Sequence, residues 1–251
     1  MTNREDAHTY QPPLGARRAV ITGGTTGIGR AVAVLLASYG VKVFVCGRTP
    51  QHLEDALARI REVGVGEGLA LDVSDAAELR RFFDAAEEWL DGVDIAVVNA
   101  AVPAEALADT AEDAMRYQIE TDFTAYLATA MLAADRMEPG SDIIFIGSMS
   151  AVSRKKGTSV YVAAKAGIQG FAQSLRQELA ERDIKVGLVE PGFTGADFQY
   201  PDFPAGKQAE LINEDRMLRA EDIAVAVHFM LSQPRRTAVS LMRVETRLEH
   251  P

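Results

Sequence analysis

Several features that would indicate particular classes of protein are scarce in this sequence. Its 251 residues include a single cysteine, Cys46, which excludes an internal disulfide, and four histidines without metal-ligand spacing, His8, His52, His228 and His250. No run approaches the roughly 18 apolar residues of a membrane-spanning helix. We therefore predict no bound metal and no membrane partner. Cys46, in an apolar run, is expected to be a buried thiol in a cytoplasmic protein.

Positive charge is also in short supply, because 26 Lys and Arg residues stand against 36 Asp and Glu residues for a formal net charge of -10. That balance disfavours nucleic acid and anionic membranes as partners, since both carry negative charge. Residues 1–14 are polar and lack the apolar stretch of a signal peptide. We expect them to form a disordered extension ahead of one folded domain at residues 15–251, a common length for a single α/β unit.

Seven short runs rich in β-branched residues alternate with helical patterns along the chain. Such alternation indicates right-handed crossovers and a parallel sheet covered on both faces. We therefore expect a doubly wound α/β fold with a mostly parallel, seven-stranded sheet. Residues 193–208 mix Gly, Pro, Asp and aromatic residues, which predicts a long loop able to close over a ligand. The seven runs are residues 17–22, 41–47, 67–73, 93–100, 141–148, 184–192 and 239–245.

The first run leads through a glycine-rich turn, "ITGGTTGIGRAVAVLL", directly into an apolar-periodic helix. Gly23, Gly27 and Gly29 allow the backbone to turn tightly and to approach a pyrophosphate, whose charge is stabilised by the positive end of the helix. The spacing differs from the usual G-x-G-x-x-G, and a glycine-rich turn by itself can also be purely structural. Its place between a strand and a helix favours a dinucleotide site.

The end of the second run bears on which dinucleotide fits. An NAD site places an acidic residue near the adenosine ribose, whereas an NADP site places a cation near the 2′-phosphate. Here the run ends "CGRTP", in which Gly47 leaves room, Arg48 offers a bidentate guanidinium, and no carboxylate stands to repel a phosphate. NADP(H) is therefore favoured. If Arg48 is only a residue of a solvated loop, the choice of nucleotide is looser.

The stretch "SVYVAAKAG" at residues 159–167 places a tyrosine and a lysine four positions apart among small and apolar side chains. On a helix, Tyr161 and Lys165 share one face and can approach the same atom. The pair is also common by chance, with the lysine extended to solvent and the tyrosine at the rim of a core. The chemical reading is that an ammonium beside Tyr161 lowers its pKa from about 10, so that it can exchange a proton.

Together these motifs resemble those of the short-chain dehydrogenase/reductase family over about residues 17–245. "TGGTTGIG" is similar to the family's TGxxxGxG loop, "LDVSD" to its adenine-side acidic motif, "VNAAV" to its NNAG element, "YVAAK" to its YxxxK motif and "EPG" to its PG motif. The resemblance implies a single-domain Rossmann fold that binds NADP(H). The implied cofactor-binding residues are Gly23, Thr25, Thr26, Gly27, Ile28, Arg48, Thr49, Asp72, Val73, Asn99, Ala100, Tyr161, Lys165, Pro191, Gly192 and Thr194.

The same resemblance assigns the chemistry to three side chains. Reduction of a ketone by hydride leaves an alkoxide, which needs a proton and a hydrogen-bond donor in a dry site. Tyr161 is expected to supply the proton as general acid, and Ser148 to polarise the carbonyl. Lys165 would assist Tyr161 and hold the nicotinamide ribose.

One departure from the family pattern bears on the catalytic residues. Where most relatives have Asn in the helix before the fifth run, this chain reads "ETDFTA", so Asp122 takes its place unless the alignment slips by one onto Thr121. We count Asp122 among the catalytic residues, because an ionised carboxylate there would pair with Lys165 and offset part of the positive field on Tyr161. If Asp122 turns away, or is protonated by burial, it behaves much like Asn.

These observations favour an NADP(H)-dependent oxidoreductase that interconverts a ketone or aldehyde with the alcohol of a small organic substrate. The alternative is an NADP(H)-binding regulatory protein with impaired turnover, a hypothesis motivated by Asp122. The basic run at residues 154–156 leaves an anionic substrate open, although such runs usually face solvent. The resemblance also implies a homo-oligomer, a tetramer or a dimer, that pairs helices around residues 111–137 and 158–182.

Overall fold

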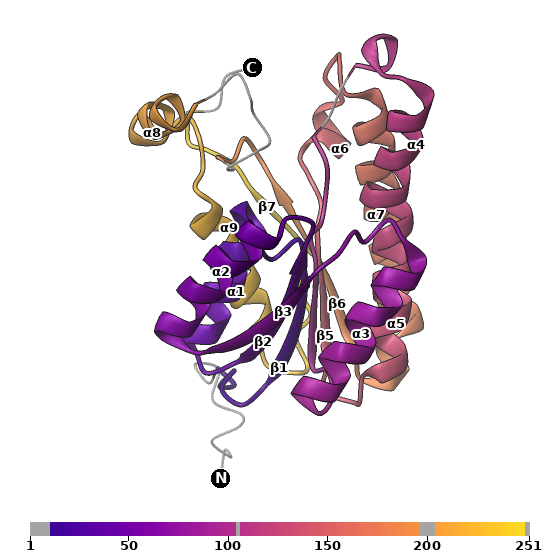
Figure 1. Cartoon of the computed structure of the whole chain (residues 1–251), viewed down its shortest axis with the longest axis vertical. Helices are drawn as coiled ribbons and strands as arrows, with labels where there is room; N and C mark the ends of the chain where they lie inside the picture. Colours follow the sequence, from indigo (N-terminus) through magenta and orange to yellow (C-terminus); the bar gives the residue numbers. More distant parts are fainter. Residues whose placement is uncertain (1–10, 104–105, 196–203, 249–251) are drawn as a thin grey trace.

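The computed structural model describes residues 11–103, 106–195 and 204–248. Within these ranges the chain forms one sheet with the strand order β3-β2-β1-β4-β5-β6-β7, so the direction of winding reverses between β1 and β4 (Figure 1). Every strand pair is parallel, which confirms the predicted doubly wound α/β fold. The strands are β1 Arg18–Thr22, β2 Lys42–Gly47, β3 Val65–Ala70, β4 Ile95–Val98, β5 Asp142–Ile146, β6 Lys185–Pro191 and β7 Leu241–Val244.

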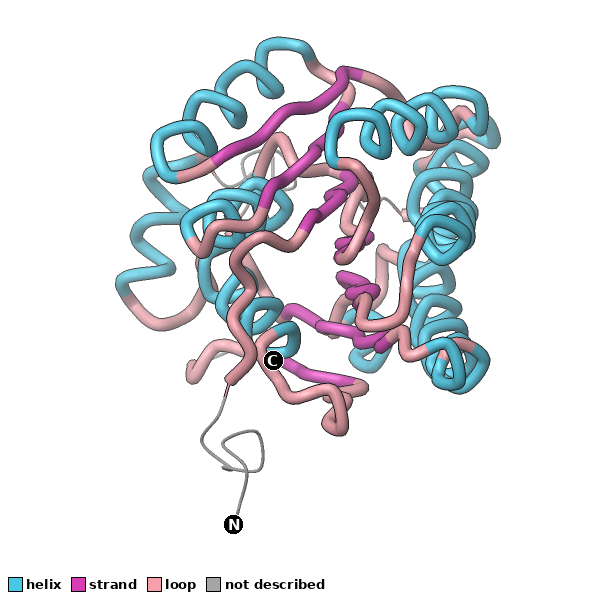
Figure 2. The backbone as a smooth tube through the Cα atoms, turned by 90° about the horizontal axis from the view of Figure 1, so that it is seen from below, coloured by secondary structure: helices cyan, strands magenta, loops and turns pink. Residues whose placement is uncertain are grey.

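Helices cover both faces of this sheet (Figures 1 and 2). On one face lie α1 Gly27–Ser38, α2 Pro50–Val63 and α9 Ala220–Leu231, and on the other α3 Ala76–Leu90, α5 Ala125–Arg136 and α7 Ser159–Glu178. The remaining helices are α4 Glu112–Ile119, α6 Ser150–Ser153 and α8 Ala205–Asn213, with short 3-10 segments η2 Leu107–Asp109 and η4 Ala180–Arg182 and the π-helical segment η3 Glu120–Thr124.

The core is divided by the sheet into two clusters, because side chains alternate between the faces of a strand. On β1, Val20 packs with the helices α3, α5 and α7, whereas Ala19 and Ile21 pack with α1, α2 and α9. On β2, Cys46 is fully buried, and this burial raises the pKa of its thiol to about 12. The expectation of a buried cysteine is confirmed.

The helix α7 carries the predicted catalytic pair. Its buried residues Ala164, Lys165, Ile168 and Ala172 recur at helical spacing and turn one face toward the sheet. The preceding helical run contains the π-helical turn η3, and such turns are frequent at functional sites. The two elements pack against each other, so the start of α7 lies beside η3.

Two boundaries differ from those predicted. Of the expected extension, residues 1–10 lie outside the described residues, but Leu14 is only 4% exposed and joins the core beside α1, so the folded part begins before residue 15. Of the expected loop at residues 193–208, residues 196–203 lie outside the description. Its final part is helical, because α8 begins at Ala205 and buries Leu211. In the described ranges, no helix combines the length and apolar character needed to cross a membrane.

Candidate active site

The site begins where β1 and β4 separate, at the reversal in strand order. Ligands of open α/β sheets bind outside the carboxyl ends of the strands at such a point. Asn99, which follows β4, donates from Nδ2 to the carbonyl oxygens of Thr22 and Gly23, both at 3.1 Å, and its backbone N–H donates to Thr22 Oγ1 at 3.0 Å. These bonds join the end of β4 to the glycine-rich turn.

Close packing explains the glycines of this turn. Gly23 has a φ of +64°, and a Cβ on it would lie 2.7 Å from the Cα of Ala100; a Cβ on Gly29 would lie 2.2 Å from the Gly23 carbonyl oxygen. At the end of β2, a Cβ on Gly47 would approach Thr25 Oγ1 to 2.1 Å. Side chains are therefore excluded at all three positions. The glycines thus let the turn, the end of β4 and the end of β2 pack closely, and Gly23, Gly27 and Ile28 line the cleft above them.

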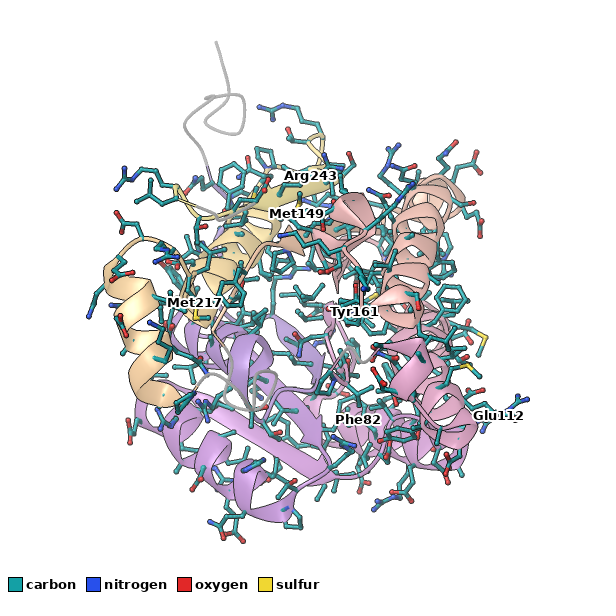
Figure 3. The ribbon with its side chains drawn as sticks, turned by 90° about the horizontal axis from the view of Figure 1, so that it is seen from above. Phe82, Glu112, Met149, Tyr161, Met217 and Arg243 are labelled. Atoms are coloured by element: carbon teal, nitrogen blue, oxygen red, sulfur yellow. The ribbon has the colours of Figure 1, made fainter. Side chains whose placement is uncertain are left out.

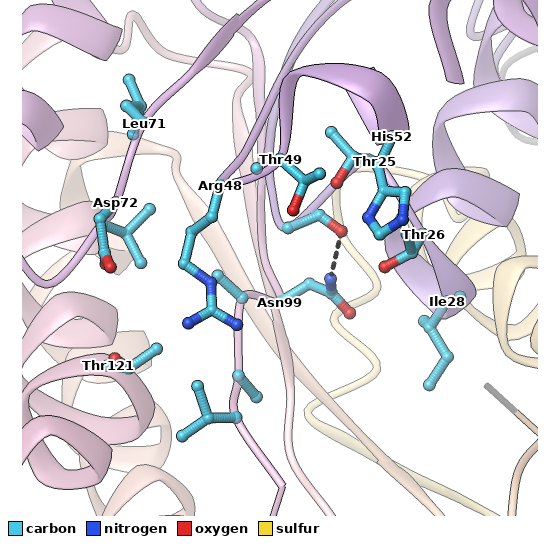
Figure 4. A pocket seen from close by; sticks show the side chains of 17 residues that line it. Thr25, Thr26, Ile28, Arg48, Thr49, His52, Leu71, Asp72, Asn99 and Thr121 are labelled. Atoms are coloured by element: carbon cyan, nitrogen blue, oxygen red, sulfur yellow. Dashed lines mark hydrogen bonds between the residues drawn. The ribbon is translucent and has the colours of Figure 1, made fainter. Parts of the chain in front are cut away.

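A cleft with a volume of about 190 Å³ lies over these strand ends (Figure 4). The lining also includes Gly47, His52, Leu71, Ala101, Val102 and Thr121, which are not among the predicted cofactor-binding residues. The predicted cofactor residues in the lining are Gly23, Thr25, Thr26, Gly27, Ile28, Arg48, Thr49, Asp72, Val73, Asn99 and Ala100.

A hydrogen-bonded chain crosses one end of the cleft. Arg48 Nη1 donates to the Tyr117 hydroxyl at 2.7 Å, and that hydroxyl donates to Asp72 Oδ2 at 2.6 Å. Burial opposes ionisation of Asp72, but the hydrogen bonds from Tyr117 and Ser74 outweigh it and hold the pKa of this carboxyl below its ordinary value. The Tyr117 hydroxyl thus links the Arg48 guanidinium, at the end of β2, to the Asp72 carboxylate.

Further along the carboxyl edge, α7 brings Tyr161 and Lys165 together. Tyr161 is half-buried and lies near the centre of the molecule when the edge is seen from above (Figure 3). Lys165 is only 2% exposed, and its Nζ lies 5.5 Å from the centroid of the Tyr161 ring. Burial lowers the pKa of Lys165 to about 8, against the opposing effect of Asp122. Lys165 therefore does not extend to solvent.

The Lys165 ammonium is held by two acceptors. Its Nζ donates to the Tyr126 hydroxyl at 2.8 Å and to the carbonyl oxygen of Ile146 at 3.2 Å. The Tyr126 hydroxyl itself donates to the same carbonyl at 3.1 Å. The three groups form a closed network between α5, α7 and the end of β5.

Asp122 lies on η3 and is completely buried. Its Oδ1 accepts a hydrogen bond from the Val102 backbone N–H at 2.8 Å, whereas no hydrogen bond of its Oδ2 is found among the described residues. Burial raises the pKa of Asp122 to about 6, although the charge of Lys165 opposes this rise. The expected ion pair with Lys165 does not form, because Val102 holds the carboxylate and Tyr126 and Ile146 take the hydrogen bonds of the ammonium.

Ser148 stands two residues beyond β5. Its Oγ accepts a hydrogen bond from the backbone N–H of Ser150 at 3.0 Å. This bond uses one lone pair of the hydroxyl and leaves its hydrogen to be donated to a ligand.

The three predicted nicotinamide residues lie at the end of β6, outside the lining of the cleft. The Met149 N–H donates to the Pro191 carbonyl at 2.9 Å, the Gly192 N–H donates to the Val244 carbonyl at 2.7 Å, and Thr194 Oγ1 donates to the Gly192 carbonyl at 3.0 Å. The loop after β5 is thus joined to the end of β6 on the same carboxyl edge. Within the described ranges, no three His, Cys, Asp or Glu side chains are placed to hold a metal ion.

The family model for short chain dehydrogenases matches residues 17–205, most of the chain. The chain is a short-chain dehydrogenase/reductase. As a member of this family it is an oxidoreductase.

Similar proteins are known in several organisms. The dehydrogenase is 34% identical to carbonyl reductase family member 4 of Xenopus laevis and to the 3-oxoacyl-acyl-carrier-protein reductase FabG of Haemophilus influenzae, over 85% of this chain and 90% of each relative. A solved short-chain dehydrogenase from Burkholderia cenocepacia, in complex with NADP, superimposes with a TM-score of 0.82 at 27% identity, covering 93% of this chain and 98% of that one.

Two tyrosines of the dehydrogenase were not found from its sequence. Tyr126 lies four residues after Asp122, the same spacing that joins Tyr161 to Lys165, so the sequence held a signal for it. Tyr117 carried no such signal, because its partners Arg48 and Asp72 are 69 and 45 residues away. Helix α4 brings it to the cleft from the opposite side.

Proposed function

We propose that this enzyme interconverts a ketone or aldehyde with the alcohol of a small organic substrate, using NADP(H), with Tyr161 as general acid and base. The observation that carries the proposal is the buried ammonium of Lys165, whose Nζ lies 5.5 Å from the Tyr161 ring centroid. With a pKa of about 8, Lys165 is mostly protonated at neutral pH. A cation in a dry site favours the phenolate that remains after Tyr161 has given up its proton.

The residues present fit the nucleotide. Gly23 and the start of α1 line the cleft where a pyrophosphate would lie, and Arg48 in the same lining offers charge for a 2′-phosphate. Asp72 and Val73 would border the adenine, with Thr49 beside them. Towards the other end, the nucleotide would be held by Asn99, Ala100, Pro191, Gly192, Thr194 and the Lys165 ammonium. When bound, the nucleotide supplies or accepts the hydride.

The chain's own side chains manage the oxygen and the proton. The Ser148 hydroxyl, with one lone pair occupied by Ser150, donates to the carbonyl oxygen. Tyr161 then gives its proton to the oxygen that becomes an alcohol, and in the reverse direction its phenolate removes that proton. Lys165 stabilises the negative charge on Tyr161 in both directions. The buried surroundings strengthen these interactions.

The substrate and the assembly belong to the same proposal. The loop at residues 154–156 is exposed and basic, which suits an anionic substrate, but its exposure also suits an ordinary solvated loop.

Two large apolar side chains, Ile119 on α4 and Met131 on α5, are 38% and 59% exposed, which favours pairing of these helices in a homotetramer or homodimer. We place the enzyme in the cytoplasm, without nucleic-acid or membrane partners.

The decisive experiment is reduction of a panel of ketones and aldehydes with NADPH by the wild type, Tyr161→Phe and Tyr39→Phe. Tyr161→Phe keeps the ring but deletes the proton donor, so we expect turnover to fall at least about 100-fold while NADPH binding is retained. Tyr39 is 51% exposed and serves as the control for loss of a hydroxyl elsewhere. Turnover by Tyr161→Phe above about 1% of the wild type would refute the assignment.

The regulatory alternative rests on the carboxylate of Asp122 at the position where most relatives have Asn. It predicts that the wild type binds NADPH but oxidises it with no member of the panel. The same panel distinguishes the two functions, because NADPH binding is measured without substrate and NADPH oxidation is measured with each substrate.

A further inference from the structure

Tyr126 is a fully buried tyrosine to which the proposed reaction gives no role. It is 1% exposed on α5, and its ring stacks on Phe145 with centroids 6.4 Å apart. Burial raises the pKa of Tyr126 well above its ordinary value, so the hydroxyl stays protonated. A buried hydroxyl needs hydrogen-bond partners, and both of its partners belong to the site: it accepts from Lys165 and donates to the Ile146 carbonyl.

The network accounts for the position of Lys165. An ammonium has three N–H donors, and two of them are directed at Tyr126 and Ile146. The Nζ also lies 4.3 Å from the Tyr126 ring centroid and 5.5 Å from that of Tyr161, so the cation is flanked by two phenol rings. One donor is left to face a ligand.

No other side chain takes the place of Tyr126 as an acceptor for this ammonium among the described residues. The charged and titratable groups around Lys165 are Asp122 from η3, Tyr126 from α5 and Tyr161 from α7 itself, with the Ile146 carbonyl at the end of β5. Asp122 acts only through its charge, because its hydrogen bond comes from Val102. The Tyr126 hydroxyl is therefore the side-chain group that fixes where the ammonium stands.

We propose that Tyr126 is a positioning residue for the reaction, whose hydroxyl, anchored on the Ile146 carbonyl, holds the Lys165 ammonium beside Tyr161 and favours its protonated form. This inference rests on the proposed function of Tyr161 and Lys165. It gives Tyr126 a part in setting the pH range in which the enzyme is active.

The test is Tyr126→Phe, which keeps the stacking on Phe145 and removes one acceptor from Lys165. Loss of a hydrogen bond to the charged form lowers the pKa of Lys165, so we expect the alkaline midpoint of kcat/KM for ketone reduction to move down by about half to one pH unit. We expect kcat to fall roughly threefold to tenfold, with the KM for NADPH nearly unchanged. Tyr39→Phe is the matched control and keeps the wild-type profile.

A second measurement does not depend on turnover. The chain contains six lysines, so the side-chain NMR resonance of Lys165 can be assigned and titrated in the wild type, Tyr126→Phe and Tyr39→Phe. We expect the pKa of Lys165 to be lower in Tyr126→Phe than in the other two. This measurement also shows whether the variant is folded, because Lys185, which is partly buried against Asp142, keeps its shift only in folded protein.

The outcomes distinguish the proposed function from the positioning role of Tyr126. A wild type that reduces no carbonyl compound contradicts the proposed function, whatever the titrations give. A wild type that turns over, with superimposable pH profiles for Tyr126→Phe and Tyr39→Phe, overturns the role of Tyr126. Equal Lys165 titrations in all three proteins overturn it as well.

Discussion

Replacing the buried Asp122 with Asn should stabilise the protein at neutral pH and leave it nearly unchanged in acid. The folded-state pKa of Asp122 is raised from 3.8 to about 6 by burial, a difference that corresponds to about 3 kcal/mol against the ionised form. Since the folded pKa is the higher one, the contribution of Asp122 to stability is present below pH 3.8 and is lost as the pH rises through about 6. Asn resembles the protonated carboxyl and keeps an Oδ1 to accept from Val102.

Urea unfolding at several pH values measures this effect. We expect Asp122→Asn to exceed the wild type by about 3 kcal/mol at pH 7 and above, and by about half of that at pH 5. Asp135→Asn, which removes an exposed carboxylate on α5, is the control and should change little at either pH. A gain that does not vary with pH, or a loss at pH 8, would refute the reasoning that burial without a full set of partners penalises this charge.

Asp122→Asn should also change the pH dependence of the reaction. Withdrawing the carboxylate from the neighbourhood of Lys165 removes a negative charge that opposes the phenolate of Tyr161. The pH profile of alcohol oxidation, which needs that phenolate, should therefore move to lower pH in Asp122→Asn. Superimposable profiles would leave Ser148, Tyr161 and Lys165 as the catalytic residues without Asp122.

Two further predictions concern the nucleotide. Arg48→Ala should weaken NADPH binding by about tenfold and NADH binding by less than about twofold, because only NADPH carries a 2′-phosphate; equal losses in a fluorescence titration would make Arg48 a surface residue. Tyr117→Phe frees Arg48 from its hydrogen-bond partner and should tighten NADPH roughly threefold without affecting NADH. A parallel change for both nucleotides would show that Tyr117 acts on the shared part of the cofactor.

The parts of the candidate site whose placement could be predicted from the sequence are those set by local chemistry. The glycine-rich turn follows β1 directly, and the close contacts of Gly23 and Gly29 leave no room for a side chain there. Alternation of strands and helices fixes which strand ends meet, so Arg48 and Asn99 were brought to one cleft as expected. The Tyr161 and Lys165 pair follows from the spacing of a single helix.

Contacts between distant segments could not be predicted in this way. Asp122 was expected to pair with Lys165, but the backbone N–H of Val102, 20 residues away, holds it. Lys165 finds its acceptors 39 and 19 residues back along the chain, and neither spacing has a local signature. The helix α8 was missed because its flanking Gly and Pro residues outweighed the apolar Leu211 that it buries.

The burial of Cys46 gives this protein a built-in reporter of unfolding. It is the chain's only thiol, and it lies in β2 with a pKa raised to about 12, so it is neither accessible nor ionised in the native fold. An alkylating reagent can therefore modify it only after the core around β2 has opened, and each modified molecule gains a single mass increment. Labelling followed by mass spectrometry would thus measure how often this core opens under native conditions, without any denaturant and without an engineered probe.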